Sequence, residues 1–281
     1  MRDRETAFAK INLALHVRRR RADGYHDLET LFAFAEEGDV LHATPADALS
    51  LTVGGPFAAA LAGDDPADNL VLRAGEALRM AFGVTAGAAL TLDKRLPVAS
   101  GIGGGSADAA AALRLLVRVW RLPAGDPRIT AISATLGADV PACLGSVATR
   151  GDGRGDRLVG VDAAALTGMP LLLVNPGVAL STAAVFAGWD GQDRGALAVG
   201  APWAAARSGR NDLEPPARVL VPGIVAVLDE LGAGEGVRLV RMSGSGATCF
   251  ALYEDARGRD AAAARIAVAR PEWWRLATRL R

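Results

Sequence analysis

A run of glycines between Leu96 and Ala110 has the composition of a loop that holds phosphate groups. The segment reads Leu-Pro-Val-Ala-Ser-Gly-Ile-Gly-Gly-Gly-Ser-Ala-Asp-Ala-Ala. Glycines let the backbone approach an anion closely, and the N–H groups and positive dipole end of a following helix favour negative charge. The hydroxyl of Ser106 can donate to a phosphate or help to hold a metal ion. Because the residue order is neither a P-loop nor a strand leading into Gly-x-Gly-x-x-Gly, we expect a different type of phosphate loop.

Two further segments supply groups that phosphoryl transfer requires. Lys10 and Asn12 lie in the segment 8–17, whose partial alternation of apolar and polar residues predicts a strand with both side chains on one face. Asp139 lies in the segment 136–141, Leu-Gly-Ala-Asp-Val-Pro. A carboxylate can take the proton of an acceptor hydroxyl, and an ammonium beside that hydroxyl favours its alkoxide form. Positioned donors and Mg²⁺ stabilise the charge on the transferred group.

Each of these features also has a structural explanation. Taken alone, Asp139 fits a helix cap or a turn, and Lys10 fits a solvated surface position. The glycine loop fits a structural turn or a dinucleotide site, and the second glycine-rich turn, 243–248, fits a tight connection between two strands. Their occurrence in one chain favours a kinase site over these separate explanations.

The segment 18–26 offers two more candidate contacts. Tyr25 and His26 follow a turn signal, and they are either loop residues or rings that stack on a base and hydrogen-bond to it. The four arginines 18–21 are either a nucleic-acid patch or, more commonly for an isolated run, a solvated face.

Basic residues are used unevenly along the chain. Lys10 and Lys94 are the only lysines, so 29 of the 31 basic residues are arginines. A lysine kept against this bias indicates either chance or a site that needs a compact ammonium rather than a planar fork. Acidic residues also number 31, so no net charge favours nucleic acid or an anionic membrane surface as a partner.

Length and composition indicate a globular protein of two domains. The 281 residues exceed the usual domain size of roughly 100 to 200 residues, and the polar turn 151–156 predicts domains over 1–158 and 159–281. No apolar run approaches the roughly 18 residues that span a bilayer, and the charged start does not resemble a signal peptide, so we expect a cytoplasmic protein. Cys143 and Cys249 lack metal-ligand spacing and are expected to be buried thiols.

The pattern of apolar residues predicts an α+β chain. Strands are expected over 8–17, 28–34, 88–92, 170–174, 237–242 and 249–253. Helices are expected over 70–81 (with Asp68 or Asn69 as its cap), 107–119, 129–136, 181–187, 219–231 and 261–269. The helix over 107–119 follows the glycine loop directly, so its N-terminus should face the loop.

In order and spacing, the glycine loop, the segment 136–141 and the Ser-Gly-Ser-Gly turn at 243–246 resemble the GHMP kinases. This superfamily includes galactokinase, homoserine kinase, mevalonate kinase and phosphomevalonate kinase. Ala-Lys-Ile-Asn-Leu at 9–13 and Arg-Ala-Asp-Gly-Tyr-His-Asp-Leu at 21–28 are similar to the branch whose substrate is 4-diphosphocytidyl-2-C-methyl-D-erythritol. The resemblance covers nearly the whole chain. It implies a two-domain fold, with an N-terminal domain like ribosomal S5 domain 2 and a C-terminal ferredoxin-like domain.

The resemblance also implies a reaction and residue roles. The reaction is ATP-dependent phosphorylation of the 2-hydroxyl of that substrate in the non-mevalonate isoprenoid precursor pathway, with ATP as co-substrate and Mg²⁺ as the metal. By similarity, Asp139 is the base and Lys10 polarises the acceptor hydroxyl. The implied substrate-binding residues are Asn12, Tyr25, His26, Thr182 and Phe186. The implied ATP-binding residues are Asn69, Lys94, Pro97, Gly101, Gly103, Gly104, Gly105 and Ser106, with Ser106 also the candidate metal ligand.

Two other functions stay open at this point. The chain fits another GHMP small-molecule kinase, acting on homoserine, a sugar or mevalonate, or a nucleotide-binding regulator that keeps the fold without the chemistry. The presence of Lys10, Ser106 and Asp139 disfavours the regulator. The expected partner is a small-molecule cytidyl diphosphate substrate, without nucleic acid or membrane, and the expected state is a monomer or weak homodimer.

Overall fold

The computed structural model describes residues 3–63 and 65–281, and the chain forms two compact units. The first unit contains Met1–Ala9, Glu37–Val98 and Gly103–Ser146, and the second contains Lys10–Glu36, Ala99–Ile102 and Val147–Arg281. Two long paired strands, β1 (Asp3–Arg20) and β2 (His26–Ala46), contribute residues to both units. The domain boundary expected after residue 158 stays a prediction.

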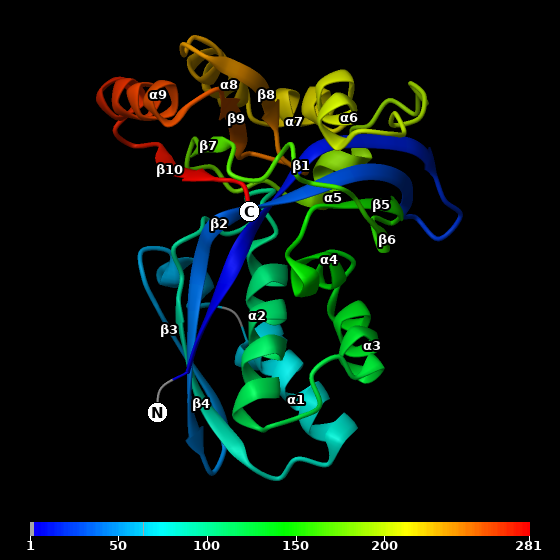
Figure 1. Cartoon of the computed structure of the whole chain (residues 1–281), viewed down its shortest axis with the longest axis vertical. Helices are drawn as coiled ribbons and strands as arrows, with labels where there is room; N and C mark the ends of the chain where they lie inside the picture. The colour runs from blue at the N-terminus through cyan, green and yellow to red at the C-terminus, as the bar shows by residue number, and fades with distance from the viewer. Residues whose placement is uncertain (1–2, 64) are drawn as a thin grey trace. The chain divides into compact units, whose positions relative to one another are not determined.

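In the first unit, four helices pack beside a small set of strands (Figure 1). The C-terminal half of β2 pairs antiparallel with β4 (Gly87–Asp93), and β4 pairs in parallel with β3 (Leu49–Gly54). The helices are α1 (Leu70–Phe82), α2 (Gly104–Val119), α3 (Pro127–Leu136) and α4 (Val140–Gly145), and two short 3₁₀ helices are η1 (Ala58–Leu61) and η2 (Pro66–Asp68). The alanines and leucines of α2 are buried, because this helix packs against α1, α3 and α4.

Local sequence signals explain where these helices start. Asn69 caps α1 as predicted, since its Oδ1 accepts a hydrogen bond from Val71 N at 2.9 Å, a contact that contributes about 1 kcal/mol. The helix predicted from residue 107 begins three residues earlier, at Gly104. Gly103 has a φ of 65°, a left-handed conformation that glycine adopts without strain, and it turns the chain into α2.

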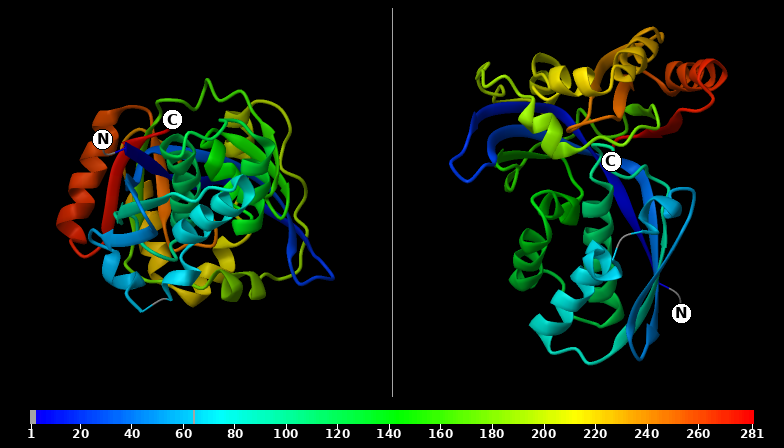
Figure 2. Two further views of the ribbon diagram at one scale, coloured as in Figure 1. Left: turned by 90° about the horizontal axis from the view of Figure 1, so that it is seen from below. Right: turned by 180° about the vertical axis from the view of Figure 1, so that it is seen from behind.

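The second unit contains a sheet of β7 (Pro170–Asn175), β8 (Val237–Met242), β9 (Cys249–Tyr253) and β10 (Trp274–Arg279). The strand order is β10-β7-β9-β8 and all pairs are antiparallel. The helices α8 (Gly223–Gly232) and α9 (Ala256–Ala269) pack on this sheet (Figures 1 and 2). A strand-helix-strand-strand-helix-strand sequence with the first strand between the third and fourth is the ferredoxin-like arrangement, so that expectation is confirmed.

The remaining elements of the second unit surround this sheet and the adjoining parts of β1 and β2. They are β5 (Thr149–Gly153), β6 (Arg157–Gly160), α5 (Thr182–Ala187), α6 (Pro202–Ser208) and α7 (Glu214–Leu220). The N-terminal half of β2 pairs with β5, and β5 pairs with β6. Leu15 and Val17 of β1 belong to the same apolar core as Leu172, Cys249 and Tyr253. Both cysteines of the chain are free and buried, as expected.

One predicted helix is wrong. The segment 219–231 is broken between α7 and α8, because Val221 has φ −132° and ψ 85° and precedes Pro222, which lacks an N–H and excludes the helical conformation from its neighbour. The final helix was also predicted too short: α9 starts at Ala256, where Asp255 accepts a hydrogen bond from Gly258 N at 2.8 Å. The apolar patterns missed several short elements, namely β3, α4, β5, β6, α6 and β10.

Candidate active site

The first unit contains the helical end of the glycine loop. Gly104, Gly105 and Ser106 form the first turn of α2, and the capping position is Gly103, which has no side chain to cap this helix. The first backbone N–H groups of a helix have no partner within it, so an uncapped glycine-rich start can donate to an anion. The arrangement fits the predicted phosphate cradle, with Ser106 inside the helix rather than in the loop before it.

Lys94 lies in a buried cluster next to this helix start. Its Nζ donates to Asp39 Oδ2 at 2.5 Å and to Asp108 Oδ2 at 2.7 Å, and its exposed fraction is only 2%. Burial lowers the pKa of the Lys94 ammonium, but the charges of Asp108 and Asp39 outweigh burial and raise it. Full burial, together with the charge of Asp39, raises the pKa of Asp108 to about 7 despite Lys94. The two carboxylates share one cation, and the Asp108 Oδ1 atom has no hydrogen-bond partner among the described residues.

The other residues assigned to ATP in the first unit have simpler surroundings. Asn69 is the cap of α1, with its Oδ1 engaged by Val71 N. Pro97 is buried directly after the chain segment that Asp39 binds, where Asp39 Oδ1 accepts from Leu96 N at 2.8 Å. Both residues therefore lie at fixed positions in the structure, while their contact with a nucleotide stays a prediction.

Asp139 stands immediately before α4, after the turn at Gly137. It occupies the capping position, yet its side chain makes no capping hydrogen bond, and its backbone carbonyl accepts from Cys143 N at 3.0 Å. The residue is half-buried. Asp139 therefore occupies the cap position that its structural explanation expects, but its carboxylate does not cap α4.

In the second unit, Lys10 and Asn12 lie on one face of β1, as predicted. Lys10 Nζ donates to Asn12 Oδ1 at 3.2 Å and lies 4.4 Å from the centroid of the Phe32 ring. Asn12 Nδ2 donates to Thr30 Oγ1 at 2.8 Å, and this hydroxyl donates to the Ala14 carbonyl at 2.7 Å. Lys10 and Asn12 are almost fully buried. The chain of hydrogen bonds fixes the ammonium, because the amide that receives it is itself held by the neighbouring strand.

The Ser-Gly-Ser-Gly turn hydrogen-bonds to three other segments of the second unit. Ser243 Oγ accepts from Asn12 N at 3.2 Å and donates to the Gly101 carbonyl at 2.9 Å. A Cβ on Gly101, whose φ is 78°, would lie 2.4 Å from the Ser243 carbonyl oxygen, so only glycine fits there. Ser245 Oγ hydrogen-bonds to Thr182 Oγ1 at 2.9 Å. The turn also connects two strands, as its structural explanation requires, since Ser243 N donates to the Thr248 carbonyl.

His26 and Phe186 form an aromatic pair. Their rings are stacked with centroids 4.9 Å apart, and Trp189 meets the His26 ring edge-on at 5.6 Å. Burial lowers the pKa of His26, and the charge of Arg20 lowers it further, so the imidazole is neutral at pH 7. Tyr25 is 55% exposed and lies beside Arg154, whose guanidinium carbon is 5.1 Å from the ring centroid.

Sequence reasoning missed several residues that hold the site. Asn211 Nδ2 donates to the carbonyls of Met242 and Gly244, both at 2.8 Å, and so supports the Ser-Gly-Ser-Gly turn. Trp189 completes the aromatic group around His26, and its buried Nε1 has no hydrogen-bond partner in the described part of the chain. The scarcity of asparagine, with four in the chain, was a usable signal for Asn211. Trp189 had none beyond its residue type.

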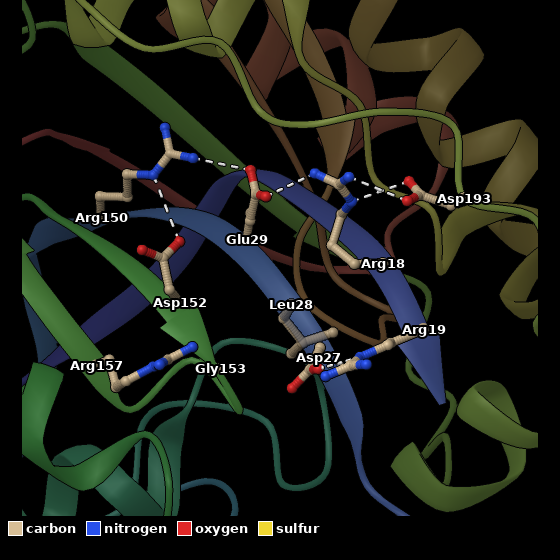
Figure 3. A pocket seen from close by; sticks show the side chains of 10 residues that line it. All are labelled: Arg18, Arg19, Asp27, Leu28, Glu29, Arg150, Asp152, Gly153, Arg157 and Asp193. Atoms are coloured by element: carbon tan, nitrogen blue, oxygen red, sulfur yellow. Dashed lines mark hydrogen bonds and ion pairs between the residues drawn. The ribbon is translucent and has the colours of Figure 1, made fainter. Parts of the chain in front are cut away.

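A polar pocket of about 460 Å³ in the second unit is a separate feature (Figure 3). Four arginines and four carboxylate residues line it, so it presents no net charge to an anion. Glu29 is the centre of the network, since its carboxylate pairs with Arg18 at 2.6 Å and with Arg150 at 2.8 Å. None of the predicted site residues lines this pocket. The lining arginines of the 18–21 run are thus ion-paired, which fits the solvated-face explanation.

The described residues contain neither a cluster of metal ligands nor a membrane-spanning helix. No group of three or more His, Cys, Asp or Glu side chains there is arranged to hold a metal ion. No helix in residues 3–63 and 65–281 is long and apolar enough to cross a bilayer.

Comparisons with known proteins identify the family of the chain. Residues 69–146 match the family described as GHMP kinases N terminal domain, and residues 203–270 match GHMP kinases C terminal. At the level of fold alone, the chain is similar to the mevalonate kinase of Methanococcus jannaschii, with a TM-score of 0.70, 10% identity and coverage of 100% of this chain and 98% of the other. The chain is a GHMP kinase in sequence and fold, which confirms the two-domain α+β expectation.

Two closer similarities narrow the family. The chain is 61% identical over 281 residues to the 4-diphosphocytidyl-2-C-methyl-D-erythritol kinase of Rhizorhabdus wittichii, covering 100% of this chain and 96% of the relative. A crystal structure of 4-(cytidine 5'-diphospho)-2C-methyl-D-erythritol kinase is similar with a TM-score of 0.81, 33% identity and 99% coverage of both chains. Within the GHMP kinases, the chain therefore belongs to the 4-diphosphocytidyl-2-C-methyl-D-erythritol kinase family.

Proposed function

We propose that the chain transfers the γ-phosphoryl group of ATP to the 2-hydroxyl of 4-diphosphocytidyl-2-C-methyl-D-erythritol, a step of the non-mevalonate route to isoprenoid precursors. The observation that carries this proposal is the 61% identity over the whole chain to a relative named for that kinase activity. The buried, oriented ammonium of Lys10 and the half-buried carboxylate of Asp139, at the start of α4, are groups that suit the transfer.

The aromatic pair of the second unit supports recognition of a cytosine. Stacked His26 and Phe186 offer flat apolar surfaces against which a base can pack, and the neutral imidazole can both donate and accept hydrogen bonds. We assign Tyr25 to the same base and Asn12 and Thr182 to the remainder of the substrate. The Tyr25 ring is exposed, so a base that binds beside it would cover the ring.

The proposed chemistry divides between two charged residues. Asp139 accepts the proton of the 2-hydroxyl, while the hydroxyl oxygen forms a bond to the γ-phosphorus and the bond from that phosphorus to the bridging oxygen of ADP breaks. Lys10 stabilises the negative charge that develops on the attacking oxygen. Asn12 keeps the ammonium in place, because its carbonyl oxygen accepts from Lys10 and its amide is anchored on Thr30.

We assign the ATP phosphates to Gly101 and to the residues Gly103–Ser106. The supporting observation is the uncapped start of α2, whose backbone donors can satisfy an anion. We also assign to the nucleotide side of the site Asn69, Lys94 and Pro97. Mg²⁺ in kinases is held by one or two protein ligands together with substrate phosphates, and the hydroxyl of Ser106 suits such a ligand. The ion would neutralise charge on the transferred group.

A coupled ADP-release assay with 4-diphosphocytidyl-2-C-methyl-D-erythritol tests the proposal. We expect turnover with this acceptor, and we expect Asp139→Asn to lose most of the rate while binding ATP normally. Asp93→Asn is the matched control, because the Asp93 carboxylate is partly exposed and pairs with the exposed Arg95. No turnover by folded wild-type protein would overturn the proposal.

The same assay separates the alternatives. Transfer to homoserine, a sugar or mevalonate without a cytidine requirement would identify another GHMP small-molecule kinase. Nucleotide binding without turnover of any acceptor would identify a non-catalytic regulator. The structural similarity to the mevalonate kinase supports the fold, but at 10% identity it does not support mevalonate as the substrate.

We further propose that the protein works in the cytoplasm as a monomer or weak homodimer, on a small molecule and without nucleic acid. The balance of 31 basic and 31 acidic residues supports this, because no excess positive charge attracts a polyanion. Light scattering across a concentration series tests the oligomeric state, and a tight dimer at the lowest concentration would contradict it.

A further inference from the structure

The chain segment that leads toward the glycine loop is held by one carboxylate. Asp39, at 0% exposure on β2, accepts through Oδ1 from Arg95 N at 2.5 Å and from Leu96 N at 2.8 Å. Its Oδ2 accepts from Lys94 Nζ at 2.5 Å. A buried carboxylate that receives three donors fixes the backbone that supplies them.

The same ammonium reaches the helix on the other side of the loop. Lys94 Nζ donates to Asp108 Oδ2 at 2.7 Å, and Asp108 lies in the second turn of α2. Lys94 therefore joins the strand end before the loop to the helix after it. Both ends of the predicted phosphate loop depend on this one bridge.

The cluster also lies directly against the first residue of α2. A Cβ added to Gly104 would lie 3.1 Å from Lys94 Nζ, 3.8 Å from Asp39 Oδ2 and 3.9 Å from Leu96 Cβ. The backbone of Gly104 thus packs against the Lys94 ammonium and its neighbours. A shift of Lys94 would move the N–H groups that we assign to the ATP phosphates.

Building on the proposed function, we propose that Lys94, held by Asp39 and Asp108, is a positioning residue that sets the geometry of the phosphate loop and does not itself bind ATP. Its ammonium is nearly excluded from solvent and engages two carboxylates, so binding a nucleotide phosphate would require breaking at least one buried ion pair. This role replaces the direct contact of the Lys94 side chain with ATP that the family resemblance implies.

The size of the site explains why it holds lysine in a chain whose cations are otherwise almost all arginine. A compact ammonium fits between two carboxylates and the bare Cα of Gly104, whereas a planar guanidinium needs more room and a different donor geometry. Of the two explanations that the composition left open, chance or a need for a compact ammonium, this geometry favours the second, and the Lys94→Arg variant tests it.

Nucleotide affinity measured on the intact enzyme tests the proposal. The variants are Asp108→Asn, which keeps the Lys94–Asp39 pair, and Lys94→Arg, which keeps the charge, with Asp93→Asn as the surface control. We expect Kd for ADP and KM for ATP to rise roughly tenfold in the first two variants, the loss expected when a hydrogen bond to a charged ligand is misplaced. At saturating ATP, kcat and the KM for the acceptor should stay near the wild-type values.

The opposite assignment makes the opposite prediction. If the ammonium were an ATP ligand, Asp108→Asn would release it, and nucleotide affinity would stay the same or increase. Either result, or a lower kcat with unchanged ADP affinity, would overturn the positioning role. If Lys94→Arg fails to fold, Asp108→Asn decides alone. Wild-type protein that binds no nucleotide would overturn the proposed function first, and that result is distinct from a variant without effect.

Discussion

The two lysines of this chain are both buried, yet one lies in each unit and their surroundings differ. Lys94, in the first unit, is compensated by two carboxylates at 2.5 and 2.7 Å. Lys10, in the second unit, donates to the neutral amide of Asn12 and lies over the Phe32 ring. Asn12 and Phe32 orient the Lys10 ammonium, whereas Asp39 and Asp108 both pair with that of Lys94.

This difference indicates a division of labour. An ammonium that an amide and an aromatic ring orient can stabilise negative charge on a substrate, as a role at the acceptor hydroxyl requires. An ammonium held by two carboxylates acts on its surroundings through geometry. We therefore expect changes at Lys10 to affect the rate of transfer and changes at Lys94 to affect nucleotide affinity and stability.

The largest expected effect tests the Lys10 side of the comparison. Lys10→Met should lower kcat by about 10²- to 10⁴-fold, the range for losing a group that stabilises developing charge, while Kd for ADP stays near the wild-type value. Steady-state kinetics and equilibrium nucleotide binding measure both quantities. A variant that retains its kcat but loses nucleotide affinity would reverse the proposed roles.

The second prediction concerns stability. Lys94→Met leaves two carboxylates buried without their cation, which should lower the free energy of unfolding by about 3 to 5 kcal/mol. Urea unfolding of Lys94→Met and of the wild type measures the loss, and an unchanged free energy of unfolding would contradict the stabilising role of the cluster.

A third prediction extends the comparison from the lysines to the substrates. Phe186→Ala removes the ring that stacks on His26, and it should raise the KM for the cytidyl acceptor roughly tenfold, as loss of a stacking contact to a base does. The KM for ATP should not change, in contrast to Asp108→Asn. Initial rates with each substrate varied in turn measure both constants, and a rise confined to ATP would contradict the assignment of the base.

The smallest effect is a pH dependence in the second unit. Burial, and then the charge of Arg210, lowers the pKa of His16. Its Nε2 accepts from Arg210 N at 3.2 Å and its Nδ1 pairs with the Gly195 carbonyl, so the folded protein needs the neutral ring. As the pH falls through about 6.5, His16 of the unfolded chain binds a proton, whereas His16 of the folded chain stays neutral to a lower pH. The stabilisation is complete above that pH and is lost as the pH falls below it.

Unfolding free energies at pH 7.5 and 5.5 test this sign. The wild type should lose more stability on acidification than His16→Gln, with a difference of at most about 1.4 kcal/mol per pH unit, the limit for a single proton. A variant that loses as much stability as the wild type would show that His16 does not contribute.

Local signals in the sequence predicted those residues whose structural contacts lie only a few positions away along the chain. Asn69 as the cap of α1, Lys10 and Asn12 on one strand face, and a helix start after the glycine loop all depend on contacts within a few residues. The break at Pro222 was also a local signal, and the prediction of one helix over 219–231 gave apolar spacing too much weight against it.

Partners separated along the chain could not be predicted in the same way. Asp39 and Asp108 are 55 and 14 residues from Lys94, and composition alone does not choose them from 31 acidic residues. Asn211 and Trp189 likewise acquire their roles only when folding brings the segment before α7 to the end of β8 and the segment after α5 to His26. The rarity of lysine drew attention to these two residues, but tertiary contacts decide which side chains surround each of them.

Single-turnover phosphoryl transfer at saturating ATP and cytidyl acceptor tests the division of labour most directly. Wild type, Lys10→Met and Asp108→Asn are compared under these conditions, where a weakened nucleotide affinity no longer limits the rate. We predict that Asp108→Asn transfers at close to the wild-type rate and that Lys10→Met stays slow. A slow Asp108→Asn enzyme beside a fast Lys10→Met enzyme would contradict the account.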